Sequence, residues 1–212
     1  MPVSYLSLAQ LAALPSTVIP LLNATAVSSL SSSQVGALST SSIAAIDTTQ
    51  LAALSPGQVR GLTATQIPSI ASALTFSVEQ LLVLGKPQFA ALTSTQLDGF
   101  DTTHISAISA AQLSAVSATN FSSLDETQIA ALSATQVKAL TAAQIKGLSE
   151  TDVGELSATQ IALFSSTQIG GFSATNFSAL DPAIIAALTT TQLKGTTTTQ
   201  IAGLSATALG AL

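Results

Sequence analysis

The sequence predicts an all-α fold, a tight solenoid in which each octapeptide repeat forms one short helix. Three observations support this: a strict eight-residue period, a helix-capping pattern at the start of each period, and two apolar positions three residues apart. Residues 7–70 divide into eight octads and residues 77–212 into seventeen. Residues 71–76 are a six-residue irregularity between these arrays, and residues 1–6 lead into the first. We expect one continuous repeat domain.

The apolar residues of each octad stand at positions 5 and 8. Position 5 is large and apolar in all 25 octads, and position 8 is apolar in 24, with Thr196 as the exception. Residues three apart share a face of a helix but lie on opposite faces of a strand, which favours helix. One continuous helix would rotate the apolar stripe by about 80° per octad, because each residue turns it by ~100°. The helix must therefore break once per octad.

Position 1 marks the break, because it is Ser, Thr, Asp or Asn in 23 octads, with Pro15 and Gly85 as exceptions. All 16 glutamines stand at position 4. Ser or Thr followed three residues later by Gln is a capping box, in which each side chain binds the other residue's backbone amide. Position 1 is thus the predicted N-cap, and positions 2 to 8 are about two turns of helix. The Gln row either caps helices only or also forms a hydrogen-bonded ladder between coils.

Proline and charge support this register. Pro56 and Pro182 stand at position 2, the first helical residue, where proline is tolerated. Pro20 and Pro68 stand at position 6, where they should distort their helices. Basic residues gather at position 6, in the last turn, where the helix dipole favours them. These are Arg60, Lys138, Lys146 and Lys194.

One octad cannot fold alone, since isolated helices this short do not form in water. Stability must come from stacking, and the small residues at position 7 allow close approach. The sequence leaves open how many octads make one coil. A β-solenoid is the rival architecture, because Thr is abundant and short periods suit β-helices. The spacing of positions 5 and 8 and the position of Gln disfavour it.

Composition excludes several functions. Ala, Ser and Thr make up 95 of 212 residues, charged residues are 7%, and the chain has no Cys and one His. This excludes thiolate and His-cluster zinc sites, and five basic residues are too few for a nucleic-acid surface. No apolar run approaches the ~18 residues of a membrane-spanning helix. We expect no catalytic, cofactor-binding or metal-binding residues, no nucleic-acid partner and no membrane span.

Several side chains invite a functional interpretation that the register makes unnecessary. His104 occupies a Gln position three residues after Asp101, and a catalytic base there would need a nucleophile or orienting partner. The segment 98–101 has too few ligands for a calcium site. The acidic cluster is a solvated surface or a weak cation site, and consists of Glu150, Asp152 and Glu155. Core residues rather than a ligand cage are expected at Phe89, Phe100, Phe121, Phe164, Phe172 and Phe177.

Position 3 is Thr in 16 of the 25 octads. In a regular solenoid this predicts an evenly spaced row of hydroxyl and methyl groups. Such a row is either an ordinary uncharged surface or one that matches an ordered lattice such as ice or crystalline polysaccharide.

Two octads are typical of the repeat: one begins Thr-Thr-Thr-Gln-Leu at residue 189, and the other begins Ser-Ala-Thr-Ala-Leu at residue 205. They resemble the Thr/Ser-Thr-x-Gln-Ile-x-Ala-Leu arrays of very large bacterial surface or secreted proteins, often labelled adhesin-like. The resemblance covers nearly the whole chain and implies an extracellular or cell-surface spacer with no catalytic motif. Residues 1–10 contain no Lys or Arg and so lack the basic start of a secretory signal.

We therefore expect a non-enzymatic structural protein: an extended rod, a spacer or a self-assembling scaffold. The alternative is a binding module whose Thr-rich face recognises a peptide, a glycan or a lattice. The first octads are degenerate, with Pro15 at the cap and Val18 in place of Gln, which resembles a closing segment. The last octad is ordinary, with Leu209 and Leu212 in core positions. We expect that end to self-associate, contact further repeats or fray.

Overall fold

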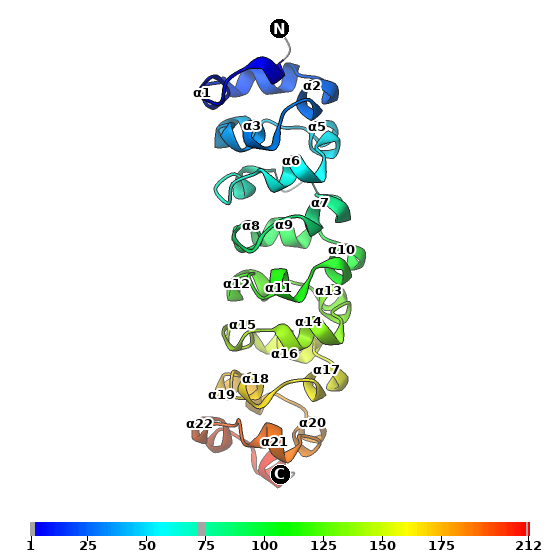
Figure 1. Cartoon of the computed structure of the whole chain (residues 1–212). Coiled ribbons are helices and arrows are strands. Elements are labelled where there is room, and N and C mark those ends of the chain that lie inside the picture. Colours follow the sequence, from blue (N-terminus) through cyan, green and yellow to red (C-terminus); the bar gives the residue numbers. More distant parts are fainter. Residues whose placement is uncertain (1–2, 72–74, 211) are drawn as a thin grey trace. The chain divides into compact units, whose positions relative to one another are not determined.

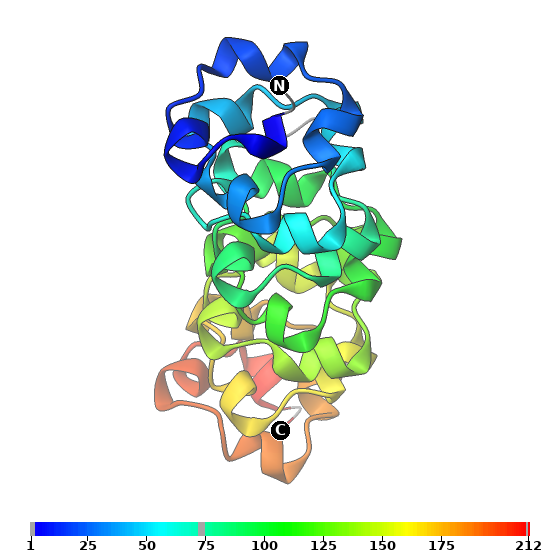
Figure 2. The same cartoon turned by 45° about the horizontal axis from the view of Figure 1, so that its top comes forward.

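The computed structural model describes residues 3–71, 75–210 and 212. These residues form a succession of short helices, and none of them lies in a strand (Figure 1). The α-solenoid prediction is confirmed, and the β-solenoid alternative is wrong. Two compact units make up the chain, Met1–Ile108 and Ser109–Leu212, hereafter the first and second unit. Within each unit the backbone winds in successive loops (Figure 2).

The first unit contains ten α-helices and three 3-10 helices among its described residues. In chain order these are η1 Val3–Tyr5, α1 Leu8–Ala12, η2 Ser16–Leu21, α2 Ala24–Ser28, α3 Ser32–Ala37, α4 Thr40–Ala44, α5 Thr48–Ala53, α6 Pro56–Arg60, η3 Ile67–Ser69, α7 Val78–Leu82, α8 Lys86–Ala90, α9 Ser94–Asp98 and α10 Thr102–Ala107.

The second unit is built from α-helices, one per octad. They are α11 Ala110–Leu113, α12 Ala118–Phe121, α13 Glu126–Ala130, α14 Ala134–Ala139, α15 Ala142–Lys146, α16 Glu150–Glu155, α17 Ala158–Ala162, α18 Ser166–Ile169, α19 Ala174–Ser178, α20 Pro182–Ala186, α21 Thr190–Leu193, α22 Thr198–Ala202 and α23 Ala206–Leu209.

Most of the described α-helices begin with a capping box, as predicted. At the start of α15, the hydroxyl of Thr141 accepts the amide of Gln144 at 3.1 Å, and the Gln144 Oε1 accepts the amide of Thr141 at 2.9 Å. Prolines also behave as expected: Pro56 and Pro182 lie in the first turns of α6 and α20. Pro20 and Pro68 lie in 3-10 helices, because proline at position 6 removes an amide donor from the α-helical pattern.

The helices are shorter than the two turns expected from the sequence. The α-helices span four to six residues and end by position 7, so the prediction of helix through position 8 is wrong. Leu140, at position 8, has φ −57° and ψ 132°, and Thr141, at position 1, is also extended. Two consecutive extended residues redirect the chain into the next octad. The corner between two helices is therefore formed by position 8 of one octad and position 1 of the next.

One coil contains between three and four octads. In the second unit α12 packs against α15 and α19 against α22, three octads apart. Hydrogen bonds link octads four apart: the Gln144 amide reaches carbonyl groups 31 and 28 residues earlier. Seven octads thus come close to two coils. The similar segments 117–132 and 173–188 are also seven octads apart.

The irregular segment 71–76 changes the residue spacing of the hydrogen bonds that the flanking octads make, and its residues 72–74 lie outside the described part of the chain. After it, Gln80, Gln88 and Gln96 bind carbonyl groups 29 and 26 residues back, whereas glutamines such as Gln144 bind 31 and 28 residues back. The difference is the two residues by which the segment is shorter than an octad. Phe76 is buried like a position 8 residue, and its carbonyl oxygen lies 3.0 Å from His104 Nε2, 28 residues later.

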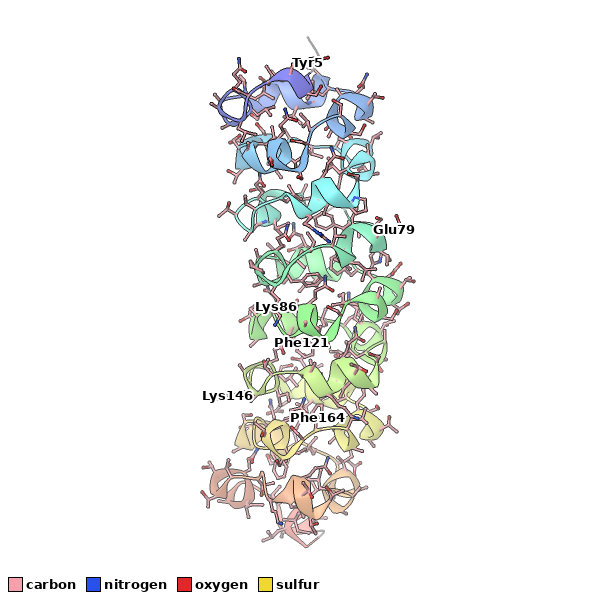
Figure 3. All side chains as sticks on the ribbon, in the orientation of Figure 1. Tyr5, Glu79, Lys86, Phe121, Lys146 and Phe164 are labelled. Carbon is pink, nitrogen blue, oxygen red and sulfur yellow. The ribbon has the colours of Figure 1, made fainter. Side chains whose placement is uncertain are left out.

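The core is a column of side chains from positions 5 and 8. Phe121 and Ile145 have no exposed surface, and Phe164 is 3% exposed. Figure 3 shows Lys146 and Glu79 at the periphery of their units. In the part of the chain that the structure describes, no helix has both the length and the apolar character needed to cross a membrane.

Candidate functional site

The most extensive polar feature is the row of position 4 side chains. Gln144 is 1% exposed, and its amide nitrogen Nε2 donates to the carbonyl oxygens of Leu113 at 2.8 Å and Val116 at 3.0 Å. Its Oε1 accepts the Thr141 amide at 2.9 Å. One side chain thus caps its own helix and uses both amide hydrogens on the previous coil. Of the two roles the sequence left open, the Gln row has both.

The same arrangement recurs along both units, and we call it the glutamine ladder. Pairs of bonds to carbonyl groups 31 and 28 residues earlier are made by Gln50, Gln58, Gln66, Gln144, Gln168, Gln192 and Gln200. Each recipient is a position 5 or position 8 carbonyl, which a short helix leaves without a partner for one of its lone pairs. In the ladder, glutamine side chains near the helix N-termini of one coil donate hydrogen bonds to the carbonyl oxygens at the helix C-termini of another coil.

Other polar residues at position 4 keep part of this connection. Ser42 is fully buried, and its hydroxyl donates to the Leu14 carbonyl at 3.1 Å. Asn176 donates to the Leu148 carbonyl at 2.6 Å. Their shorter side chains reach one carbonyl of the earlier coil, where glutamine reaches two.

His104 makes the same kind of link in the first unit. Its Nδ1 lies 2.7 Å from Asp101 Oδ1, and its Nε2 lies 3.0 Å from the carbonyl oxygen of Phe76. The ring stacks on Phe100, with ring centroids 5.6 Å apart. Hydrogen bonds from the His104 backbone amide and from its ring lower the pKa of Asp101. The second ring nitrogen, Nε2, lies against a backbone carbonyl, as a ladder amide does.

The segment 98–101 places its carboxylates in separate roles. Asp98 is exposed at the end of α9, whereas Asp101 caps α10 by accepting the amides of Thr103 and His104 at 2.9 Å. Phe100, between them, is buried in the core.

The acidic cluster of the second unit differs from the sequence prediction. Asp152 occupies a Gln position, is 7% exposed, and accepts the Ser149 amide at 2.7 Å and the hydroxyl of Ser122. Glu155 stands at position 7 with Oε2 buried and without a hydrogen bond. Its pKa is raised first by burial and then by repulsion from Asp152, Glu126 and Asp125.

Sequence reasoning missed Asp125 and Glu126 as neighbours of Glu155, because they precede it by three octads. The packing of α13 against α16 brings them together. The three-octad spacing was visible in the sequence, but it acquires meaning only once the coil length is known. Within the described ranges, no group of three or more His, Cys, Asp or Glu side chains is arranged to hold a metal ion.

A small apolar pocket lies between α17 and α20, with a volume of about 120 Å³. Ile161, Ile184 and Leu188 line it, together with four alanines. Ile184 occupies a Gln position, so this octad has no ladder amide. The side chains that line the pocket are all aliphatic, so none of them can orient a ligand through a hydrogen bond.

Position 3 threonines do not form one continuous row in chain order. Because three to four octads complete a coil, consecutive octads direct their position 3 residues to different sides. Only stacked octads, such as those of Thr127 and Thr151, can align these residues.

Comparisons with protein-family models, curated proteins and solved structures found no match to this chain.

Proposed function

We propose that the chain is a non-enzymatic structural repeat protein that serves as an extended spacer or self-assembling scaffold. The glutamine ladder is the observation that carries this proposal. Gln144, Gln168 and Gln200 make the same two bonds to the coil before them. A coil that repeats its contacts can be added without redesigning its neighbours, so length follows repeat number.

The use of polar side chains supports a structural role. Position 1 hydroxyls and carboxylates cap helices, and position 4 amides bind both the cap and the preceding coil. His104 and Asp101 are engaged in the same way. These side chains hold the architecture together, and we assign no reaction to them.

The proposed setting is the bacterial surface or the secreted fraction, and it rests on the resemblance of the octads to adhesin-like arrays. Self-association or contact with further repeats at the C-terminal end is the proposed partner interaction. A face that binds a peptide, a glycan or a lattice is the alternative. It has less support, because position 3 threonines are distributed around the coil.

Small-angle X-ray scattering tests the spacer proposal. A variant would carry a second copy of residues 117–172, seven octads, inserted after Phe172. Seven octads form about two coils, and packed helices lie about 8–10 Å apart, so the maximum dimension should grow by roughly 16–20 Å. The cross-sectional radius should stay unchanged. An unchanged maximum dimension, or a wider cross-section, would contradict the proposal.

A further inference from the structure

The octad 149–156 of the second unit, which contains α16, lacks glutamine bonds to the coil before it. Its position 4 residue is Asp152, whose carboxylate accepts the Ser122 hydroxyl. At the ladder spacing of 31 and 28 residues, a glutamine there would donate to the carbonyl oxygens of Phe121 and Leu124. In the described part of the second unit, neither oxygen receives a hydrogen bond from a side-chain amide.

The coil after this octad does not reach it through a ladder bond either. The residue in position to donate to the carbonyl oxygens of Val153 and Leu156 is Ile184, whose side chain has no donor. No side chain of the described residues hydrogen-bonds to these two oxygens. Ile184 lines the apolar pocket of about 120 Å³ between α17 and α20. The octad is therefore without ladder bonds on both sides.

The two flanking octads are connected on both sides. In the octad before it, Gln144 donates to two carbonyl groups, and the Leu148 carbonyl accepts the Asn176 amide at 2.6 Å. In the octad after it, Gln160 donates to a carbonyl group of the earlier coil at 2.8 Å, and two carbonyl groups accept Gln192 at 3.2 and 3.0 Å. The pattern of bonds between coils thus singles out the octad 149–156 from its neighbours.

Two residues inside the octad weaken it further. Gly154 lies within α16, where a glycine favours the unfolded chain because it has more conformations to lose. A Cβ added to it would meet nothing within 4 Å, so packing does not require a glycine there. Glu155 has its Oε2 buried without a hydrogen bond, and opening would expose this oxygen to water. Val153 and Leu156 are 3% and 4% exposed, and their burial keeps the closed form the more stable one.

We propose that the octad 149–156 is the segment at which the second unit opens first. α16 leaves its coil while the octads on either side stay folded, because its departure breaks no ladder bond. Departure of the octad 141–148 would break the two bonds of Gln144 and the one from Asn176. Local opening of this kind costs less free energy than unfolding of the whole unit. In an extended spacer the octad would yield before its neighbours, and only this consequence rests on the proposed spacer function.

Amide hydrogen exchange in the full chain, followed by NMR, tests the inference on matched amides. Val153 donates to the Ser149 carbonyl at 3.1 Å, and Leu156 to the Val153 carbonyl at 3.3 Å. In the octad before, the amides of Ile145 and Leu148 make the equivalent bonds, also at 3.1 and 3.3 Å. The protection factors of Val153 and Leu156 should be lower by about tenfold or more, the effect expected of missing ladder bonds. They should also depend less on urea, because a local opening exposes little surface.

Ile184→Gln should restore the missing bonds. Gln58 makes both ladder bonds from α6, a helix that has a proline in its first turn as α20 does, so this geometry is available to a glutamine at position 184. The variant should raise the protection factors of Val153 and Leu156 by about tenfold and leave those of the octad before unchanged. Ile184→Met is the matched control, because its side chain is of similar length and has no donor. Ile184 is partly exposed, so neither substitution should prevent folding.

Three results would overturn the inference. Equal protection and equal urea dependence of the four amides would show that the second unit opens as a whole. Equal effects of Ile184→Gln and Ile184→Met would show that the missing donors do not set the stability of this octad. A rise in protection at Ile145 as large as that at Val153 in the Gln variant would show that the two octads open together. The scattering test of the inserted octads does not depend on these results, so the spacer proposal stands or fails separately.

Discussion

Two adjacent octads of the second unit, 141–148 and 149–156, share a fold but differ at the positions that join coils. In the first, Gln144 donates to two carbonyls of the preceding coil. In the second, Asp152 occupies that position and accepts the Ser122 hydroxyl. Both side chains still accept the amide of their N-cap residue. Glutamine and aspartate at position 4 thus both complete the capping box, whereas the bonds to the carbonyl groups of the preceding coil require a donor.

Position 7 differs in a related way. A Cβ added to Gly147 would lie 2.8 Å from the Ala118 Cβ, so the first octad touches its neighbouring coil at this point. The second octad has Glu155 there, with one carboxylate oxygen buried and unpartnered. The octad 141–148 therefore packs closely against its neighbouring coil, whereas the octad 149–156 buries a carboxylate oxygen that no hydrogen bond satisfies.

The largest effect should come from the core of the regular octad. Ile145→Asp places a carboxylate where the side chain has no exposed surface, and we expect a loss of more than about 4 kcal/mol in the free energy of unfolding. Lys146→Asp, one residue on and exposed, should cost at most about 1 kcal/mol. Denaturant titration measures both. Equal sensitivity would contradict the assignment of positions 5 and 6.

Removal of the ladder bonds should have the next largest effect. Gln144→Glu retains the cap acceptor but leaves two carbonyls without their donor, which should cost about 2–4 kcal/mol. Gln10→Glu is the matched control. Gln10 is exposed and accepts the Ser7 amide at 2.9 Å, so its replacement should change stability by less than about 0.5 kcal/mol. Similar losses in both variants would show that the two ladder bonds of Gln144 add no stability of their own.

The glycines of the two octads should respond in opposite directions to the same substitution. Gly147→Ala forces the coil of α12 to shift, and we expect a loss of about 1–3 kcal/mol. Gly154→Ala meets nothing within 4 Å and lies inside α16, so it should stabilise the protein by about 0.5–1 kcal/mol. Thermal unfolding followed by circular dichroism distinguishes the two. A gain in both variants would mean that the coils are less closely packed than the structure indicates.

The smallest effect concerns pH. The raised pKa of Glu155 means that folding favours its protonated form. Its contribution to stability is fully present below its ordinary pKa of 4.5 and is lost as pH rises through the raised value. Glu155→Ala removes this term, so the variant should be the more stable of the two near neutral pH, by a margin that shrinks on acidification. The difference between the two unfolding curves isolates Glu155 from the capping carboxylates.

A second variant refines this measurement. Asp152→Gln removes a nearby negative charge, so the Glu155 pKa should fall toward its ordinary value in a titration followed by NMR. The new amide should also supply donors to the preceding coil, as Gln144 does. An unchanged Glu155 pKa would show that the charge of Asp152 does not contribute to raising it.

The sequence by itself determined the local structure of the repeat. A cap at position 1 and a glutamine at position 4 interact across three residues, so their pattern fixes where each helix starts. The spacing of positions 5 and 8 identified the buried side chains, and Pro20 and Pro68 marked the distorted helices correctly. These features follow from interactions within one octad, which a repeat displays 25 times.

Tertiary structure decided what depends on residues 24 or more positions apart. The number of octads per coil, the ladder bonds of Gln144 and the neighbours of Glu155 all belong to this class. The octads have similar sequences, so the sequence pattern alone allows any octad to pack against any other. The geometry of the corners fixes the number of octads per coil and therefore which octads are in contact. The corner geometry arises from two extended residues whose dihedral angles reflect packing of the whole coil. For this reason the repeat sequence predicts the helix that each octad forms, but not which other octad that helix packs against.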